Sequence, residues 1–131
     1  MPLKLYGLPR SLRLRKEKVI GHLFACREAS GAFFPLRYIC CEAEDEEPQE
    51  VQVLFSVSKK KLHNAVDRNR AKRQMREAFR LNQHLLRGAL KAQGRRVRIA
   101  FIWMAETAVE SERVERAMKV VLGKLAESDK R

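Results

Sequence analysis

Apolar and polar residues alternate along three short stretches of the chain, residues 35–43, 51–58 and 96–104. A period of two is typical of β-strands, in which successive side chains point to opposite faces. The residues that share one face are Leu36, Tyr38 and Cys40 in the first stretch, Val51, Val53, Phe55 and Val57 in the second, and Val97, Ile99, Phe101 and Trp103 in the third. The first two stretches flank an acidic loop that contains Pro48, so we expect them to pair as an antiparallel hairpin. The alternation leaves open which face of the second strand packs on the core.

Apolar residues recur at helical spacing in three other stretches. The first is residues 16–29, for which Gly31 is the expected C-terminal stop. Its apolar positions are Val19, Ile20, Leu23, Phe24 and Cys26. The second begins near Val66 and runs at least to Leu86, and Gly94 closes the connection that follows.

The third helix is expected after a capping-box pattern, Thr107 with Glu110 three residues later. Its apolar stripe is Val114, Ala117, Met118, Val121, Leu122 and Leu125. The predicted order is helix, two strands, helix, strand, helix. This order favours an α/β (α+β) two-layer sandwich, in which helices cover a small central sheet. We expect residues 1–131 to form a single domain, with a basic extended segment at residues 1–15 and the acidic loop at residues 42–50.

The net charge of +12 is unevenly distributed along the chain. Six of the sixteen acidic residues fall within residues 42–50, which leaves the rest of the chain with 28 basic against 10 acidic residues. A compact body with this charge repels itself unless a polyanion binds it. Nucleic acid is the first candidate partner and an acidic membrane surface is the second. No apolar run approaches the roughly 18 residues of a membrane span, and the N-terminus lacks the apolar block of a signal peptide.

The strongest concentration of positive charge is in residues 66–80, where Asp67 and Glu77 oppose six Arg and Lys residues. On a helix, one side of this segment is apolar and is formed by Ala71, Met75, Ala78 and Phe79. The other side is a cationic strip formed by Arg68, Asn69, Lys72, Arg73, Arg76 and Arg80, with Arg70 further round. Like charges four residues apart destabilise a helix by about 0.2–0.5 kcal/mol per pair. Phosphates reverse that effect, so the strip predicts a polyanion-binding face.

The stretch FSVSKKKLHNAVDRNRAKRQMREAFR, residues 55–80, resembles the signature of the bacterial ribonuclease P protein family. In that signature, a strand ending in S-K-K leads into a helix that carries the sequence RNR. The lead-in LPRSLRLRKEK, the segment IGHLF, the strand RVRIAFIW and the final amphipathic helix occupy the family's expected places.

The resemblance implies a protein subunit that assists a catalytic RNA in endonucleolytic removal of the 5′ leader from precursor tRNA. It implies that the RNA carries the chemistry, that the protein alone binds no cofactor, and that Mg²⁺ is held mainly through RNA. Its partners would be the catalytic RNA and precursor tRNA, in the cytoplasm, with no membrane and no obligate protein partner. It also implies that the RNR helix joins two parallel strands by a left-handed crossover, against the usual rule. A structural RNA-binding protein attached to the ribosome is the alternative, and a protein-only nuclease is more distant.

Two sets of residues match the family's binding surfaces. Those that match the RNR helix, and would contact the catalytic RNA, are Arg68, Asn69, Arg70, Lys72, Arg73 and Arg76. Those that match the leader cleft, between the first helix and the sheet, are Ile20, Phe24, Tyr38, Phe55, Lys59 and Lys60. Ile20 stands where the family usually has Phe, and the turn before the RNR helix is one residue longer than usual and lacks its common Gly.

No catalytic or metal-binding arrangement is predicted from the remaining residues. The three histidines lie in separate segments, and the dense carboxylates lie in the acidic loop. The cysteines Cys26, Cys40 and Cys41 form no C-x-x-C pair, and adjacent cysteines on a strand point to opposite faces. We therefore expect buried, reduced thiols.

Overall fold

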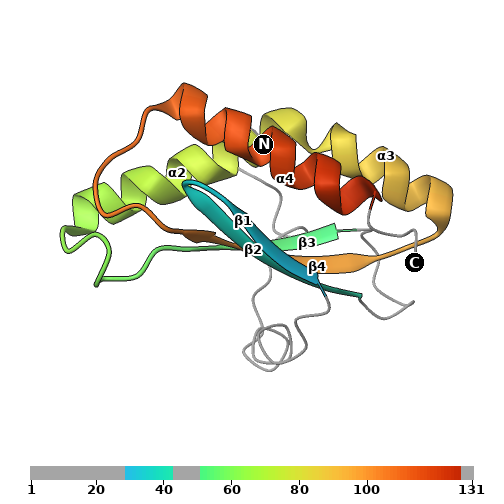
Figure 1. Ribbon diagram of the computed structural model, residues 1–131, viewed down its shortest axis with the longest axis horizontal. Helices are drawn as coiled ribbons and strands as arrows, with labels where there is room; N and C mark the ends of the chain where they lie inside the picture. The colour runs from blue at the N-terminus through green and yellow to red at the C-terminus, as the bar shows by residue number, and fades with distance from the viewer. Residues whose placement is uncertain (1–28, 43–50, 128–131) are drawn as a thin grey trace, which may run out of the picture.

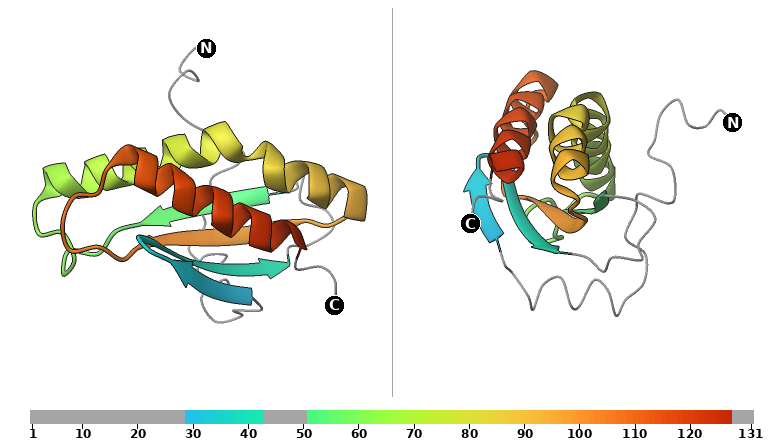
Figure 2. Two further views of the ribbon diagram at one scale, coloured as in Figure 1. Left: turned by 45° about the horizontal axis from the view of Figure 1, so that its top comes forward. Right: turned by 90° about the vertical axis from the view of Figure 1, so that its right-hand side faces the viewer.

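The structure is a computed structural model that describes residues 29–42 and 51–127 (Figure 1). Its elements are β1 (Ala29–Phe33), β2 (Leu36–Glu42), β3 (Val51–Ser56), α2 (Ala65–Asn82), α3 (His84–Gln93), β4 (Val97–Trp103) and α4 (Ser111–Glu127). The helices lie together over one face of a four-stranded sheet (Figure 2), which confirms the predicted α+β sandwich. The helix expected at residues 16–29, and most of the acidic loop, lie outside the described residues.

The strand order is β1-β2-β4-β3, so the predicted hairpin of β2 with β3 is wrong. β4 lies between them, antiparallel to β2 and parallel to β3. Six of its seven residues are buried. Burial on both faces is typical of a strand inside a covered sheet, and the near-continuous apolar sequence of β4 fits its place between its two neighbours. α2 and α3 connect β3 to β4, and the left-handed sense of that connection stays a prediction.

β1 was not expected, because its sequence ASGAF has no alternating apolar pattern. Gly31, predicted to stop a helix, lies in this strand and pairs with Tyr38 of β2. The ring of Tyr38 lies against Gly31, where an added Cβ would come within 2.8 Å of the tyrosine oxygen. The pairing with β2 thus holds β1 in place, and a residue without a side chain makes room for the ring. The β1–β2 turn contains the cis peptide bond Phe34–Pro35.

The main core lies between the sheet and the helices. It contains the predicted faces of β2 and β4, and all six residues of the predicted α4 stripe. Phe55, Phe101 and Phe79 pack together toward the β3 edge of this core, with Phe55 stacked on Phe101 at 5.6 Å between ring centroids and edge-on to Phe79 at 6.3 Å. The structure therefore settles the face of β3 that the sequence left open: Val51, Val53 and Phe55 face the helices.

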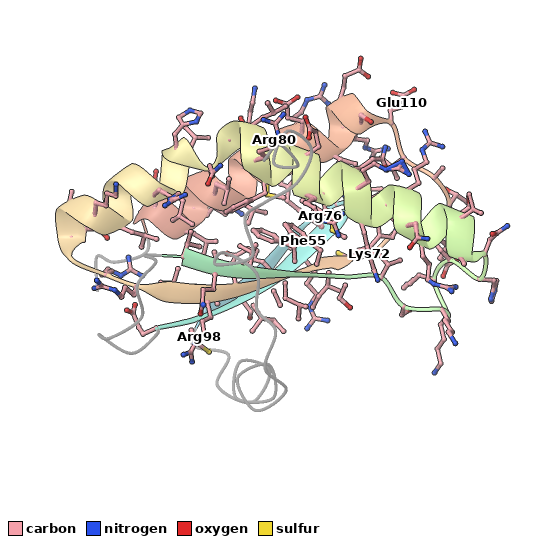
Figure 3. All side chains as sticks on the ribbon, turned by 180° about the vertical axis from the view of Figure 1, so that it is seen from behind. Phe55, Lys72, Arg76, Arg80, Arg98 and Glu110 are labelled. Carbon is pink, nitrogen blue, oxygen red and sulfur yellow. The ribbon has the colours of Figure 1, made fainter. Side chains whose placement is uncertain are left out.

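The other face of the sheet carries a smaller buried cluster of Ile39, Cys41 and Ala100. Arg98 extends on this side, away from the helices (Figure 3). Cys40 belongs to the main core, whereas Cys41 belongs to the smaller cluster. Both are buried cysteines outside any disulfide, on opposite faces of the sheet, as predicted, and Cys26 lies outside the described residues.

The helix boundaries differ from the sequence prediction at two places. α2 ends at Asn82, and α3 then continues through Gly88 to Gln93, where Gly94 caps it with a φ of 65°. This confirms the role of Gly94, which as a glycine adopts a left-handed conformation without a steric penalty.

α4 begins at Ser111, so the predicted capping box of Thr107 with Glu110 does not start the helix. The Gln74 side-chain amide donates to the carbonyl of Val109 at 2.8 Å. That carbonyl is therefore held by α2, and the side chain of Val109 is buried in the core. Both contacts keep the chain before Ser111 outside the helix.

Candidate nucleic-acid interface

The predicted two faces of the basic helix are present in α2. Its buried residues are Ala71, Met75, Ala78, Phe79 and Asn82. The helix starts at an N-cap, Asn64, whose side chain accepts a hydrogen bond from the Val66 amide at 3.1 Å. The apolar face packs on the sheet and on α4, which leaves the Arg and Lys residues on the outside of the molecule.

One flank of this basic surface lies at the edge of the sheet, beside β3. Lys72 and Arg76 are half-buried there, next to the partly exposed ring of Phe55 (Figure 3). The guanidinium carbon of Arg76 lies 5.9 Å from the centroid of that ring, a distance typical of a cation–π contact. We call Phe55, Lys72 and Arg76 the sheet-edge flank. It combines an aromatic ring with two cations, the pair of features that single-stranded nucleic acid requires.

The other flank faces α4. Arg70 and Arg73 are exposed there, and with Gln74, Glu77 and Ser111 they line a pocket of about 280 Å³. The Gln74 amide also donates to the Ser111 hydroxyl at 3.0 Å, which fixes the spacing of the two helices. We call Asn69, Arg70 and Arg73 the outer flank. Its cations are free to meet phosphates without first leaving the protein core.

An ion pair interrupts the positive charge on α2. The Nε atom of Arg80 donates to Glu77 Oε1 at 3.2 Å, and a second guanidinium nitrogen donates to Glu77 Oε2. This hydrogen bonding lowers the pKa of Glu77 below its ordinary value, against a smaller opposing effect of burial. The same hydrogen bond raises the pKa of Arg80, so both groups are charged at neutral pH. Glu77 therefore places a permanent negative charge beside the outer flank.

Arg68 has a role that the sequence prediction missed. One of its guanidinium nitrogens donates to the carbonyl oxygens of Leu62 and His63, at 2.9 and 2.8 Å. These carbonyls belong to the turn that precedes α2, the turn that carries the exposed Lys59 and Lys60. Arg68 thus holds that turn against the helix. A helical wheel cannot show this, because the contact depends on how the preceding chain folds back.

The structure brings together only part of the predicted leader cleft. Tyr38 is 8% exposed and belongs to the main core, and burial is the main cause that raises the pKa of its hydroxyl, followed by Cys40. Phe55 reaches the surface at the sheet edge, and Lys59 and Lys60 lie in the turn before α2. Ile20 and Phe24 lie outside the described residues. Lys72 and Arg76, assigned to the other surface by the resemblance, are the residues that the structure places beside Phe55.

Within residues 29–42 and 51–127, no group of three His, Cys, Asp or Glu side chains could hold a metal ion. None of the helices in these residues is long and apolar enough to cross a membrane.

A sequence model of the family Ribonuclease P matches residues 8–126, nearly the whole chain. This chain belongs to the ribonuclease P protein family. A relative described as ribonuclease P protein component, from Porphyromonas gingivalis, is 36% identical over 121 residues, which cover 92% of this chain and 88% of the relative. Another from Chlorobaculum tepidum is 38% identical over 105 residues, covering 76% of this chain and 68% of the relative.

Solved ribonuclease P proteins have the same fold. The protein from Staphylococcus aureus superposes with a TM-score of 0.67 at 24% identity, covering 88% of this chain and 95% of that one. The protein from Thermotoga maritima gives a TM-score of 0.67 at 19% identity, covering 86% of this chain and 96% of that one. The resemblance seen in the sequence is thereby confirmed, and with it the prediction of a protein component of ribonuclease P that takes part in tRNA processing. The alternative of a ribosome-attached structural protein is not favoured.

Proposed function

We propose that this chain is the subunit of ribonuclease P that binds the catalytic RNA with the outer flank of α2 and the 5′ leader of precursor tRNA with the sheet-edge flank. The observation that carries this proposal is the exposed basic surface of α2, which lies opposite the packed residues Ala71, Met75, Ala78 and Phe79. Two flanks with different chemistry lie on the two sides of the same helix. A protein with this arrangement can hold two RNA segments at a fixed separation.

The outer flank suits a folded RNA. Arg70 and Arg73 present planar guanidinium groups, which can donate two parallel hydrogen bonds to a phosphate. Asn69 directly precedes Arg70 in sequence, and its amide can both donate to and accept from a ribose or a base edge. Each phosphate that is neutralised releases counterions, so affinity at this flank depends strongly on salt.

The sheet-edge flank suits an unpaired strand. Phe55 offers a ring on which a base can stack, an interaction that is typically worth about 1–3 kcal/mol per base. Lys72 and Arg76 lie beside it and supply charge for the phosphates on either side of that base. The pair Lys59 and Lys60, in the turn held by Arg68, extends the positive charge toward the N-terminal end of α2.

In this proposal the protein supplies binding and charge neutralisation, and the RNA carries out the cleavage in the cytoplasm. The Mg²⁺ ions that assist hydrolysis are held mainly through RNA. Lowering the repulsion between leader and catalytic RNA reduces the concentration of Mg²⁺ that the reaction needs. No obligate protein partner is required by either flank.

Reconstitution with the cognate catalytic RNA at low Mg²⁺ tests the proposal. We expect the chain to accelerate leader removal from precursor tRNA under conditions in which the RNA alone is slow. Equal rates with and without the protein would refute it.

A pair of variants tests the division of labour. Arg70→Ala with Arg73→Ala should weaken binding to the catalytic RNA about tenfold or more, because two phosphate contacts are lost. Phe55→Leu should weaken binding of precursor tRNA with a long leader and leave binding of leaderless tRNA unchanged. Lys91→Ala with Lys124→Ala, two exposed cations on α3 and α4, is the matched control for charge. The two-flank arrangement would be contradicted if the double arginine variant and Phe55→Leu weakened binding of the catalytic RNA and binding of long-leader precursor tRNA to the same extent.

A further inference from the structure

A second aromatic and basic surface lies at the tip of the β1–β2 turn, away from the sheet-edge flank. Phe33 and Phe34, together with Arg113 and Arg116 of α4, line a pocket of about 360 Å³. This volume is at the small end of ligand pockets, which run from about 300 to 1,000 Å³. Among the described residues, no acidic side chain lines the pocket. The family signature, the RNR helix and the leader cleft include none of these four residues.

The two phenylalanines are unusual in their exposure. Phe33 is 40% exposed and Phe34 is 45% exposed. The other exposed large apolar side chains in the described residues are aliphatic and lie on α2 and α3, at Val66, Leu81 and Leu85. The neighbouring exposed rings, at the end of β1 and in the turn that follows it, present flat surfaces to solvent. Such rings are suited to stack on another flat group.

The arginines give the pocket its charge. The guanidinium carbon of Arg113 lies 4.9 Å from the ring centroid of Phe34, so the cation rests over the ring. A guanidinium that stacks on a ring still directs its N–H groups outward in its own plane, where they can donate to an anion. Arg116 lies about one helical turn further along α4 and lines the same pocket. Ring faces and guanidinium donors therefore meet in one site, as needed for a base and its phosphate.

We propose that this pocket binds one unpaired nucleotide of the catalytic RNA, its base stacked on the phenylalanines and its phosphate bound by Arg113 and Arg116. The proposal rests on the proposed function, and it adds a third contact to the two flanks of α2. The base must be unpaired, because the faces of paired bases are covered by their neighbours in a duplex.

The position of the pocket indicates which RNA binds there. Ser111, at the start of α4, lines the pocket that contains Arg70 and Arg73 of the outer flank. Arg113 and Arg116 follow on the first turns of the same helix and line the pocket at the hairpin tip. The beginning of α4 thus joins the two pockets, and one RNA bound to the outer flank can extend across it. The sheet-edge flank lies on the other side of α2, so the leader is the less suitable occupant.

Substitutions of Phe34 test the stacking contact, with affinity for the catalytic RNA as the measurement. Phe34→Ala should weaken binding by roughly tenfold, since stacking of one base is lost. Phe34→Tyr should bind nearly as well as the wild type because it keeps a ring, and Phe34→Leu should resemble the alanine variant. Leu85→Ala, which removes an apolar side chain of similar exposure (40%, against 45% for Phe34), is the control and should have no effect.

Salt dependence separates the arginines from the rings. Arg116→Gln should reduce the slope of log affinity against log salt by about one, because one phosphate contact is lost. Phe34→Ala should lower the affinity at every salt concentration with the slope unchanged. The same slope in wild type and Arg116→Gln would overturn the phosphate assignment.

Three results would overturn the proposal. If Phe34→Ala binds the catalytic RNA as tightly as the wild type does, the pocket is not an RNA site. The proposed function would stand in that case, because the wild-type protein still binds the RNA. A loss confined to long-leader precursor tRNA would assign the pocket to the leader instead. Concentration-dependent self-association of the wild type that Phe34→Ala abolishes, with unchanged RNA affinity, would make the pocket a protein contact. Failure of the wild-type chain to bind either RNA would refute the proposed function itself.

Discussion

At the scale of single residues, glycine and arginine have roles here that depend on the folded surroundings. Gly31 leaves room for the ring of Tyr38 on the neighbouring strand, whereas a Cβ at Gly88 would meet no atom of the described residues within 4 Å beyond its chain neighbours and its own helix backbone. Arg68 holds a turn, whereas Arg73, five residues later, is exposed to solvent. Identical residue types therefore contribute differently to stability.

Substitution by alanine should change the free energy of unfolding in opposite directions at the two glycines. Gly31→Ala should lower the free energy of unfolding by about 1–2 kcal/mol, because the new methyl group overlaps a ring that the core holds in place. Gly88→Ala should raise it by about 0.5–1 kcal/mol, because alanine is the better helix former at an open position. Urea unfolding of both variants measures the two changes. Equal destabilisation by both would contradict the contact between Gly31 and Tyr38.

Alanine substitution of Arg68 should affect mainly stability, whereas alanine substitution of Arg73 should affect mainly RNA binding. Arg68→Ala should cost about 1–2 kcal/mol of stability, since two hydrogen bonds from a charged donor to backbone carbonyls are lost at a partly exposed site. Arg73→Ala should leave the free energy of unfolding within about 0.5 kcal/mol of the wild type. Thermal melts give the stabilities, and RNA titrations of the same samples give the affinities. If Arg68→Ala has the same melting temperature as the wild type, the turn does not depend on this contact.

At the scale of elements, periodicity predicted most of the helices and strands well. The stripe of α4, the buried face of β4 and the two faces of α2 match the predicted residues because each depends on local spacing. The strand β1, the start of α4 and the pairing of β2 with β4 were missed. Each of these depends on a contact distant in sequence: Gly31 with Tyr38, Gln74 with Val109, and β4 with its two neighbours. For the site, the basic face was predictable, but the place of Phe55 beside Arg76 was not.

The ion pair on α2 should restrain RNA binding. Glu77→Gln should raise affinity for the catalytic RNA about twofold to fivefold at low salt, because it removes a negative charge beside Arg70 and Arg73 and releases Arg80. Glu127→Gln, at the far end of α4, is the matched control for net charge and should have a smaller effect. Equal gains from both variants would show that only the total charge matters.

The same pair makes a contribution to stability that depends on pH in a defined direction. The pKa of Glu77 is lowered in the folded protein from its ordinary value of 4.5, so its contribution is fully present above that pH. The contribution is lost as the pH falls through the lowered pKa. The variant Glu77→Gln should therefore lose less stability than the wild type when the pH falls from 5 to acidic values. Parallel acid-unfolding curves would contradict this.

At the scale of the whole molecule, the charge of +12 should make salt act in opposite directions on stability and on binding. Added salt screens the repulsion among Arg and Lys residues, and we expect the melting temperature of the free protein to rise between about 50 and 300 mM salt. Affinity for RNA should fall steeply over the same range, because the entropy gained by releasing counterions is smaller when the surrounding salt concentration is higher. Differential scanning fluorimetry and RNA titration in matched buffers measure both. A melting temperature that falls with salt would show that ion pairs outweigh the repulsion.

The central position of β4 has a consequence for how the chain is made. The ribosome produces β1 and β2 first, and these neighbours can pair at once. β3 follows, but its partner in the described sheet is β4, which emerges only after α2 and α3. Until β4 has been made, the sheet is incomplete, and the apolar faces of β3 and α2 are exposed to solvent. Exposed apolar surfaces of this kind promote aggregation. Synthesis that stops within α3 should therefore yield an insoluble product rather than a smaller RNA-binding protein, even though the entire basic helix has already been made.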